Sequence, residues 1–231
     1  MCTICAARAW PGRECAFPPQ PELAAPFPAA PHEREGVAAT LPAPAGRIEE
    51  IAAFLREGYH GWLDPTAYLA PPVHATGPAG EITVDLSALS PAARPLAEAA
   101  LDAWADVAHL DFRSAPAEAA QILFQESEDG AFTRWRYSFG ETRATFEGAT
   151  VNIAAELVGR HGTGWGAWTF ATYLHEVGHA LGLGHPGAYG SFAEARWGGR
   201  LFEGDTELTT VMSYFRHDGA PHLFGSRAWP V

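Results

Sequence analysis

Three histidines and one glutamate lie within eleven residues of this 231-residue sequence, in the stretch HEVGHALGLGH. His175 and His179 are four residues apart, so on a helix they share one face and both imidazoles can reach one point. His185 cannot join them on a continuing helix, because six more residues advance the chain by about 9 Å while a zinc–nitrogen bond is about 2.1 Å. We therefore expect the helix to end in a left-handed turn at Gly182, which returns His185 to the same ion.

This set of residues suits a catalytic zinc ion. Three neutral imidazoles with an open fourth position are typical of catalytic sites, whereas four protein ligands close a structural zinc site. Water takes the open position, and Glu176, directly after the first ligand, suits the general base that activates it. An amphipathic core helix with incidental histidines is the alternative, but it does not account for the complete pattern H-E-x-x-H-x-x-G-x-x-H.

Two motifs together resemble a known family. HEVGHALGLGHP resembles the zinc signature of the metzincin metallopeptidases, and TVMSYF, residues 210–215, resembles the methionine turn that follows it there. The Met-Ser-Tyr form, LDAWADVAHLDF and TFATYLHEVGHALGLGHP are similar to the serralysin branch, so that the resemblance covers about residues 46–215. It implies an α/β (α+β) fold with a twisted mixed sheet, two long helices above the cleft and a small irregular C-terminal subdomain.

The resemblance also implies roles for two residues of the methionine turn. It implies that Met212 packs beneath the three imidazoles, and that the Tyr214 hydroxyl binds the ion in the resting enzyme alongside His175, His179 and His185. Tyr214 would then leave the ion and donate a hydrogen bond to the oxyanion during catalysis. Without the resemblance, a buried methionine and a tyrosine at a core turn indicate packing alone.

The chain divides by composition. Residues 1–45 hold nine of the nineteen prolines and all three cysteines, and they predict an extended leader. Residues 46–231 form the predicted catalytic domain, with 46–185 as the upper subdomain and 186–231 as the lower. Only seventeen residues follow Tyr214, where relatives continue with a helix and glycine-rich calcium-binding repeats, so the lower subdomain looks truncated. The chain is then either a fragment or a naturally short member, and if the helix is absent we expect exposed apolar surface near Phe215 and Trp229.

The three cysteines allow two interpretations. A thiolate from Cys2, Cys5 or Cys15 could occupy the open zinc position until the leader is removed, which would make the chain a zymogen. They could equally be unused thiols, or a CxxC pair that binds metal adventitiously.

Other polar residues favour ordinary roles. Glu203 and Asp205 could bind calcium as a second ion, but two acids in a turn are usually solvated, and the chain carries no calcium-binding repeat. The remaining histidines lack ligand spacing and are predicted to lie on the surface or in loops: His32, His60, His74, His109, His161, His217 and His222.

Hydrophobic periodicity predicts the elements around the motif. A helix begins near Gly46, with Ile48, Ile51, Ala52 and Leu55 at helical spacing. Strands are predicted at residues 81–86, 120–125, 135–139 and 149–154. Ser90 and Pro91 open a long helix that runs through His109, and its predicted apolar face is Leu96, Ala100, Ala103, Trp104 and Val107. The active-site helix spans residues 168–181. Residues 134–139 are the candidate edge strand for an extended peptide substrate, with a central strand as the alternative for the same residues.

Charge and hydropathy exclude several classes of protein. Fifteen basic against twenty-seven acidic residues leave a formal charge of −12, which opposes a nucleic-acid partner. No run approaches eighteen apolar residues, and the N-terminus does not read as a Sec signal peptide. The chain is thus either retained in the cytosol or, as the resemblance implies, secreted through a dedicated channel. Expected partners are peptide or protein substrates and a proteinaceous inhibitor, with the chain as a monomer.

The sequence therefore predicts a zinc-dependent endopeptidase. A zinc-dependent endoribonuclease can carry three histidines at similar spacing, and the acidic balance and the Met-Ser-Tyr turn argue against it. A non-catalytic binding module with a decayed site is the alternative outside enzymes, and it predicts the loss of a ligand or of Glu176, all of which are present.

Overall fold

The computed structural model describes residues 47–63, 73–74, 80–139, 144–190, 195 and 199–216. The predicted leader with Cys2, Cys5 and Cys15 lies outside these residues, and so does Trp229. Among the described residues, no helix is both long and apolar enough to cross a membrane.

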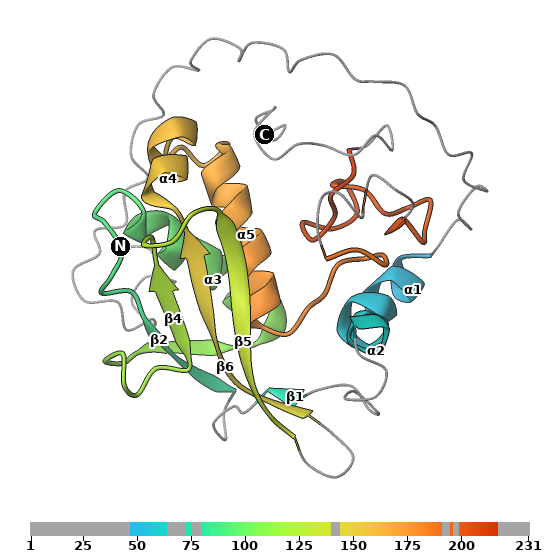
Figure 1. Cartoon of the computed structure of the whole chain (residues 1–231), viewed down its shortest axis with the longest axis horizontal. Helices are drawn as coiled ribbons and strands as arrows, with labels where there is room; N and C mark the ends of the chain where they lie inside the picture. Colours follow the sequence, from blue (N-terminus) through green and yellow to red (C-terminus); the bar gives the residue numbers. More distant parts are fainter. Residues whose placement is uncertain are drawn as a thin grey trace.

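A mixed sheet of six strands forms the centre of the fold (Figure 1). Its strands are β1 (Val73–His74), β2 (Glu81–Asp85), β3 (Asp111–Ser114), β4 (Ile122–Gln125), β5 (Ala131–Phe139) and β6 (Ala144–Ile153). Five strands run parallel in the order β1-β6-β4-β2-β3, and β5 pairs antiparallel with β6. The predicted mixed α/β fold is confirmed, and each predicted strand overlaps one of β2, β4, β5 and β6.

The β5 strand lies at an edge of the sheet. Among the described residues it pairs only with β6, through a long register that runs from Ala131 opposite Ile153 to Phe139 opposite Ala144. The prediction of an edge strand at residues 134–139 is therefore confirmed, and the strand begins three residues earlier.

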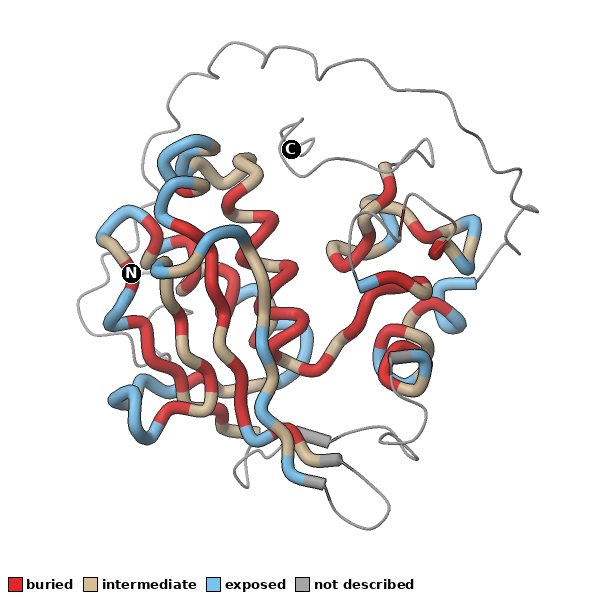
Figure 2. The backbone as a smooth tube through the Cα atoms, viewed as in Figure 1, coloured by how far each residue is buried: buried red, intermediate tan, exposed pale blue. Residues whose placement is uncertain are grey.

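Two long helices lie side by side against one face of the sheet: α3 (Arg94–Ala108) and α5 (Trp168–Ala180). A shorter helix, α4 (Ala155–His161), follows β6. Figure 2 shows buried residues along the central strands, along α5 and in the chain that follows α5. One apolar cluster joins them, and it includes Leu101 of α3, Val151 of β6 and Val177 of α5.

The apolar face predicted for α3 is partly wrong. Leu96 and Ala100 are buried as predicted, but Ala103 is exposed and the Val107 side chain is 74% exposed. In an alanine-rich helix two neighbouring stripes have similar hydrophobicity, and packing selects between them. The buried stripe consists of Leu96, Ala97, Ala100, Leu101 and Ala105.

The start of α3 also differs from the prediction. Residues 91–93 form a turn, and the regular helix begins at Arg94. Ser90 still acts at this end, because its backbone oxygen accepts from the amides of Ala93 and Arg94 and its hydroxyl lies 3.3 Å from the Ala93 amide.

The N-terminal helical segment packs with the C-terminal irregular chain. It consists of α1 (Ile48–Ala53), the π-helical turn η1 (Phe54–Gly58) and α2 (Tyr59–Leu63). Ile51 and Leu55 form a buried cluster with Met212, while Ile48 is 72% exposed. Figure 1 shows this blue segment beside the orange and red chain that follows α5. The domain boundary at residue 185 stays a prediction.

The expectation of exposed apolar surface near Phe215 is met by Leu208, which is 70% exposed and follows Glu207, whose amide donates to the Phe215 carbonyl. Phe215 itself is only 4% exposed, because its ring packs edge-on against Tyr189 and the Arg200 guanidinium lies over it. Residues 200–216 form turns and irregular structure held by such side-chain contacts.

Candidate metal centre

The active-site helix ends in a Schellman motif. The Gly182 amide donates to the His179 carbonyl at 2.8 Å, and the Leu183 amide donates to the Gly178 carbonyl at 3.0 Å. Gly182 has φ +95°, and a Cβ there would lie 2.7 Å from the Phe146 ring. Both facts require glycine, and the helix stops where the sequence predicts.

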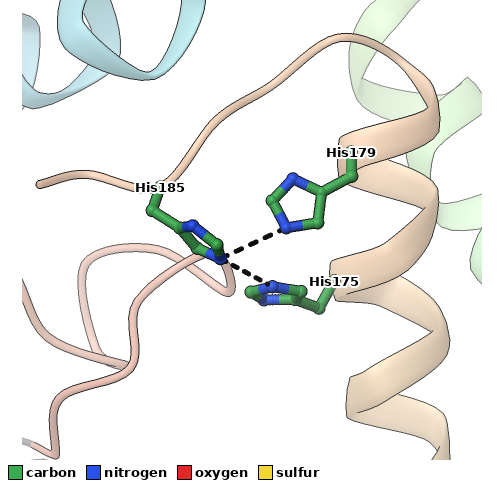
Figure 3. Close-up of side chains that lie close together, drawn as sticks. All are labelled: His175, His179 and His185. Carbon is green, nitrogen blue, oxygen red and sulfur yellow. Dashed lines mark hydrogen bonds between the residues drawn. The ribbon is translucent and has the colours of Figure 1, made fainter. Parts of the chain in front are cut away.

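The turn brings His185 back to the two histidines of α5. Figure 3 shows the three imidazoles pointing toward one another, two from the helix and one from the returning chain. His185 Nε2 lies 3.2 Å from His179 Nε2 and 3.3 Å from His175 Nε2. All three side chains are buried. The candidate ligand atoms lie within 4.8 Å of one another, so one ion can contact all three.

Backbone carbonyls fix the tautomer of each ring. The Nδ1 atoms of His175, His179 and His185 lie 2.8 Å from the carbonyl oxygens of Val211, Leu183 and Tyr189, respectively. A carbonyl only accepts, so each Nδ1 carries the proton and each Nε2 presents a lone pair. Three lone pairs facing one another in a buried site repel unless a cation lies among them. The ring orientation is thus that of imidazoles prepared for a metal.

The spacing fits zinc. Two nitrogens bound at about 2.0–2.1 Å in a tetrahedron lie roughly 3.3–3.4 Å apart, close to the separations found here. Burial lowers the pKa of His179 to about 4 and holds that of His185 well below its usual value, so both rings are neutral at physiological pH. Neutral imidazoles are what a divalent ion requires.

Glu176 lies directly beside the first ligand and is 5% exposed. Burial raises the pKa of its carboxyl group to about 8, and the Thr133 hydroxyl opposes this shift with a hydrogen bond to Oε2 at 2.8 Å. A cation held by the histidines would favour the charged form. A buried carboxyl group with a raised pKa next to a metal site is suited to accept and return a proton.

Met212 is fully buried against the middle of α5. A Cβ at Gly178 would lie 2.5 Å from the Met212 sulfur, so the thioether occupies the space that a side chain at position 178 would need. Gly178 lies between His175 and His179 on α5, and Val211, the residue before Met212, supplies the carbonyl that orients His175. Met212 therefore packs against α5 at Gly178, and its role beneath the imidazoles stays a prediction.

The Tyr214 ring lies over two of the histidines. Its centroid is 5.5 Å from that of His175, with the rings nearly parallel, and 4.5 Å from that of His185. Burial and then the charge of Glu176 raise the pKa of the phenol, so the hydroxyl keeps its proton. Tyr214 as a metal ligand stays a prediction.

Asp205 has a different role from the solvated or calcium-binding one expected. It is fully buried and accepts hydrogen bonds from the Tyr189 hydroxyl at 3.0 Å and the Ser213 hydroxyl at 2.5 Å. The Tyr189 carbonyl orients His185, and Ser213 precedes Tyr214. Asp205 thereby connects the two pieces of irregular chain that carry His185 and Tyr214. Burial raises its pKa to about 6.

His60 is a site-supporting residue that the sequence did not reveal. The prediction of a surface or loop position is wrong, because His60 is fully buried on α2 and its Nε2 donates to the Gly182 carbonyl at 2.7 Å. Of the others, His109 is exposed and His161 lies half-buried against Trp168. His32, His217, His222 and the side chain of His74 lie outside the described residues.

Comparisons with known proteins agree with the motifs. The chain is 27% identical over 150 residues to a serralysin of Photorhabdus sp. (strain Az29), an alignment that covers 62% of this chain and 29% of the relative. Serralysins of Photorhabdus laumondii subsp. laumondii and Photorhabdus luminescens are each 27% identical over 137 residues.

The chain is similar to serralysins. The chain spans less than a third of the length of these relatives, 28 to 29% of each. No protein-family model matches it.

Proposed function

We propose that this chain is a zinc-dependent endopeptidase that hydrolyses peptide bonds in extended segments of proteins. One observation carries the proposal: each histidine Nδ1 faces a backbone carbonyl, so three basic Nε2 atoms converge at one buried point. The buried Glu176 beside them and the similarity to serralysins support it further.

In this proposal His175, His179 and His185 hold one Zn²⁺. When bound, the ion supplies a Lewis acid that polarises the scissile carbonyl and lowers the pKa of water toward about 7. Glu176 takes a proton from the attacking water at a carboxylate oxygen and later gives it to the departing amine.

Tyr214 and β5 serve the substrate in this proposal. The protonated Tyr214 hydroxyl donates a hydrogen bond to the oxygen on which charge develops, a contribution of roughly 3 kcal/mol to the transition state. An extended peptide pairs by backbone hydrogen bonds with the edge of β5 that faces away from β6. The role of Tyr214 as a fourth ligand in the resting enzyme belongs to the same proposal.

Several expectations remain predictions. They are secretion by a non-Sec route, a monomeric state, a proteinaceous inhibitor and latency through the leader cysteines. Comparing zinc-dependent activity before and after removal of residues 1–45 tests latency, and equal activity rules it out.

The first test is hydrolysis of unfolded casein by the zinc-loaded chain, with and without a chelator, beside an RNA substrate. We expect casein cleavage that the chelator abolishes and added zinc restores, with the RNA intact. Cleavage of RNA would favour the endoribonuclease. Zinc binding without turnover of either substrate would favour the binding module.

The second test is Glu176→Gln, which keeps the shape of the side chain and an oxygen that can accept from Thr133. We expect zinc to remain bound and casein turnover to fall at least about a hundred-fold, because the proton acceptor is lost. Zinc content by mass spectrometry and initial rates measure the two effects. Retained activity in a metal-replete preparation would refute the assigned base.

A further inference from the structure

We propose that Thr133, on the edge strand β5, is the residue that holds the Glu176 carboxylate in position for catalysis; this inference rests on the proposed peptidase function. Thr133 Oγ1 lies 2.8 Å from Glu176 Oε2 and 2.9 Å from the backbone oxygen of the same residue. Within the described part of the chain, Thr133 is the only group that hydrogen-bonds this carboxylate.

The two contacts tie the end of the Glu176 side chain to its own backbone. The hydroxyl carries one proton and donates to one oxygen at a time, and a charged carboxylate is the stronger acceptor. A glutamate side chain has three rotatable bonds, and rotation about either of the first two would move the carboxylate away from the Thr133 hydroxyl. Because the residue is 5% exposed, bulk water cannot supply the missing donor.

The strand register explains why Thr133 faces α5. Thr133 is opposite Val151, which is fully buried under the helices, and opposed residues of an antiparallel pair point to the same face. Trp135, two residues along on the same face, donates from Nε1 to the His179 carbonyl at 2.5 Å. The inner face of β5 therefore contacts both the proposed base and the end of the ligand helix. The strand proposed to pair with substrate is also the one that positions the base.

The chain offers a matched control for a threonine substitution. Thr150 lies on the neighbouring strand β6 opposite Arg134, whose side chain is exposed, so Thr150 is on the other face of the sheet. The structure gives the described Thr150 side chain no hydrogen bond. Thr150→Val thus tests the effect of valine for threonine in a strand, while Thr133→Val also removes the donor to Glu176.

The experiment compares the full zinc-loaded chain with Thr133→Val, Thr133→Ser and Thr150→Val. We expect Thr133→Val to lower kcat about ten- to a hundred-fold, as loss of one hydrogen bond to a charged group does, with KM changed less than about two-fold. Zinc affinity, measured by competition with a chelating dye, stays unchanged. Thr133→Ser restores kcat to within about three-fold of wild type, and Thr150→Val matches wild type.

Three results would overturn the role of Thr133 while leaving the peptidase function standing. These are a kcat of Thr133→Val equal to that of Thr150→Val, a serine variant as slow as the valine variant, and a loss of zinc affinity that accompanies the loss of turnover. The last result would mean that Thr133 maintains the structure of the metal site as a whole and not the position of Glu176 alone. A zinc-loaded wild-type chain that cleaves no peptide would instead overturn the proposed function, and this inference with it.

Discussion

The two halves of the candidate zinc site are built in different ways. His175 and His179 lie on α5, whose own backbone hydrogen bonds and burial against the sheet fix their spacing. His185 and Tyr214 lie on irregular chain, and side-chain hydrogen bonds around Asp205 hold that chain in place. The helical half follows from local periodicity, whereas the irregular half depends on contacts between residues far apart in the sequence.

The turn at Gly182 joins the two halves of the site, and changing it should have the largest effect on stability and zinc affinity. Gly182→Ala places a Cβ at φ +95° and 2.7 Å from the Phe146 ring, so the returning chain must move. We expect a loss of about 2 to 4 kcal/mol of unfolding free energy and of most of the zinc affinity, measured by urea denaturation and dye competition.

Gly130→Ala is the matched control for Gly182→Ala. Gly130 has φ +85°, but a Cβ there meets nothing within 4 Å, so only backbone strain of about 1 kcal/mol applies. If the two variants lose the same unfolding free energy and both keep their zinc affinity, the turn at Gly182 does not position His185.

Replacing Asp205 should loosen only the irregular chain that carries His185 and Tyr214, and leave α5 unchanged. Asp205→Ala leaves the buried hydroxyls of Tyr189 and Ser213 without their acceptor, which costs about 1 to 3 kcal/mol, and loosens the carbonyl that orients His185. We expect zinc affinity to fall about ten- to a hundred-fold, as loss of an outer partner of a ligand does. Asp205→Asn keeps one acceptor oxygen and should retain more of the affinity. An alanine variant with wild-type affinity would contradict the role of Asp205.

Low pH should destabilise the metal-free chain through both halves at once. His179 and His185 are buried and neutral, with the pKa of His179 lowered from 6.5 to about 4. The unfolded state therefore binds more protons below pH 6.5, and stability falls by up to about 1.4 kcal/mol per pH unit for each histidine. The burial of His60 adds to this effect, because it too lowers a pKa.

Buried carboxyl groups act in the opposite direction. The pKa of Glu176 is raised from 4.5 to about 8. As the pH falls from 8, the folded state therefore binds this proton before the unfolded state does, and stability rises. Asp205, with its pKa raised to about 6, opposes part of the histidine effect below that pH. Urea denaturation with chelator at pH 6.5 and 8 should show lower stability at pH 8, where Glu176 begins to lose its proton in the folded state. In Glu176→Gln the decline from pH 6.5 to 8 should disappear, and a persisting decline would contradict this assignment.

The sequence predicted the helical half well for a physical reason. Period-2 and period-3.6 patterns, with Gly182 as a stop, describe local backbone geometry, and β2, β4 and α5 lie within two residues of their predicted bounds. The strand β1 has only two residues, and β3 buries only Phe112, so neither shows a period in its apolar residues. On α3, alanines on every side left the choice of buried stripe to the packing partners.

The supporting residues could not be predicted in the same way. Thr133 acts on Glu176 across 43 residues of chain, and His60 acts on Gly182 across 122, so neither has a local signal. Asp205 was detectable only as a polar residue near the methionine turn, where a solvated acid is the commoner case. The motif predicts the ligands, while tertiary contacts determine which residues hold them.

The most direct test of the convergent histidines is zinc X-ray absorption spectroscopy on the full chain loaded with one equivalent of zinc. We expect three imidazole nitrogens at about 2.0–2.1 Å, with the remaining coordination supplied by oxygen. Replacing His185 with alanine should remove one of these nitrogens. A spectrum dominated by sulfur, or one unchanged by the loss of His185, would contradict the claim that the helix end returns this residue to the ion.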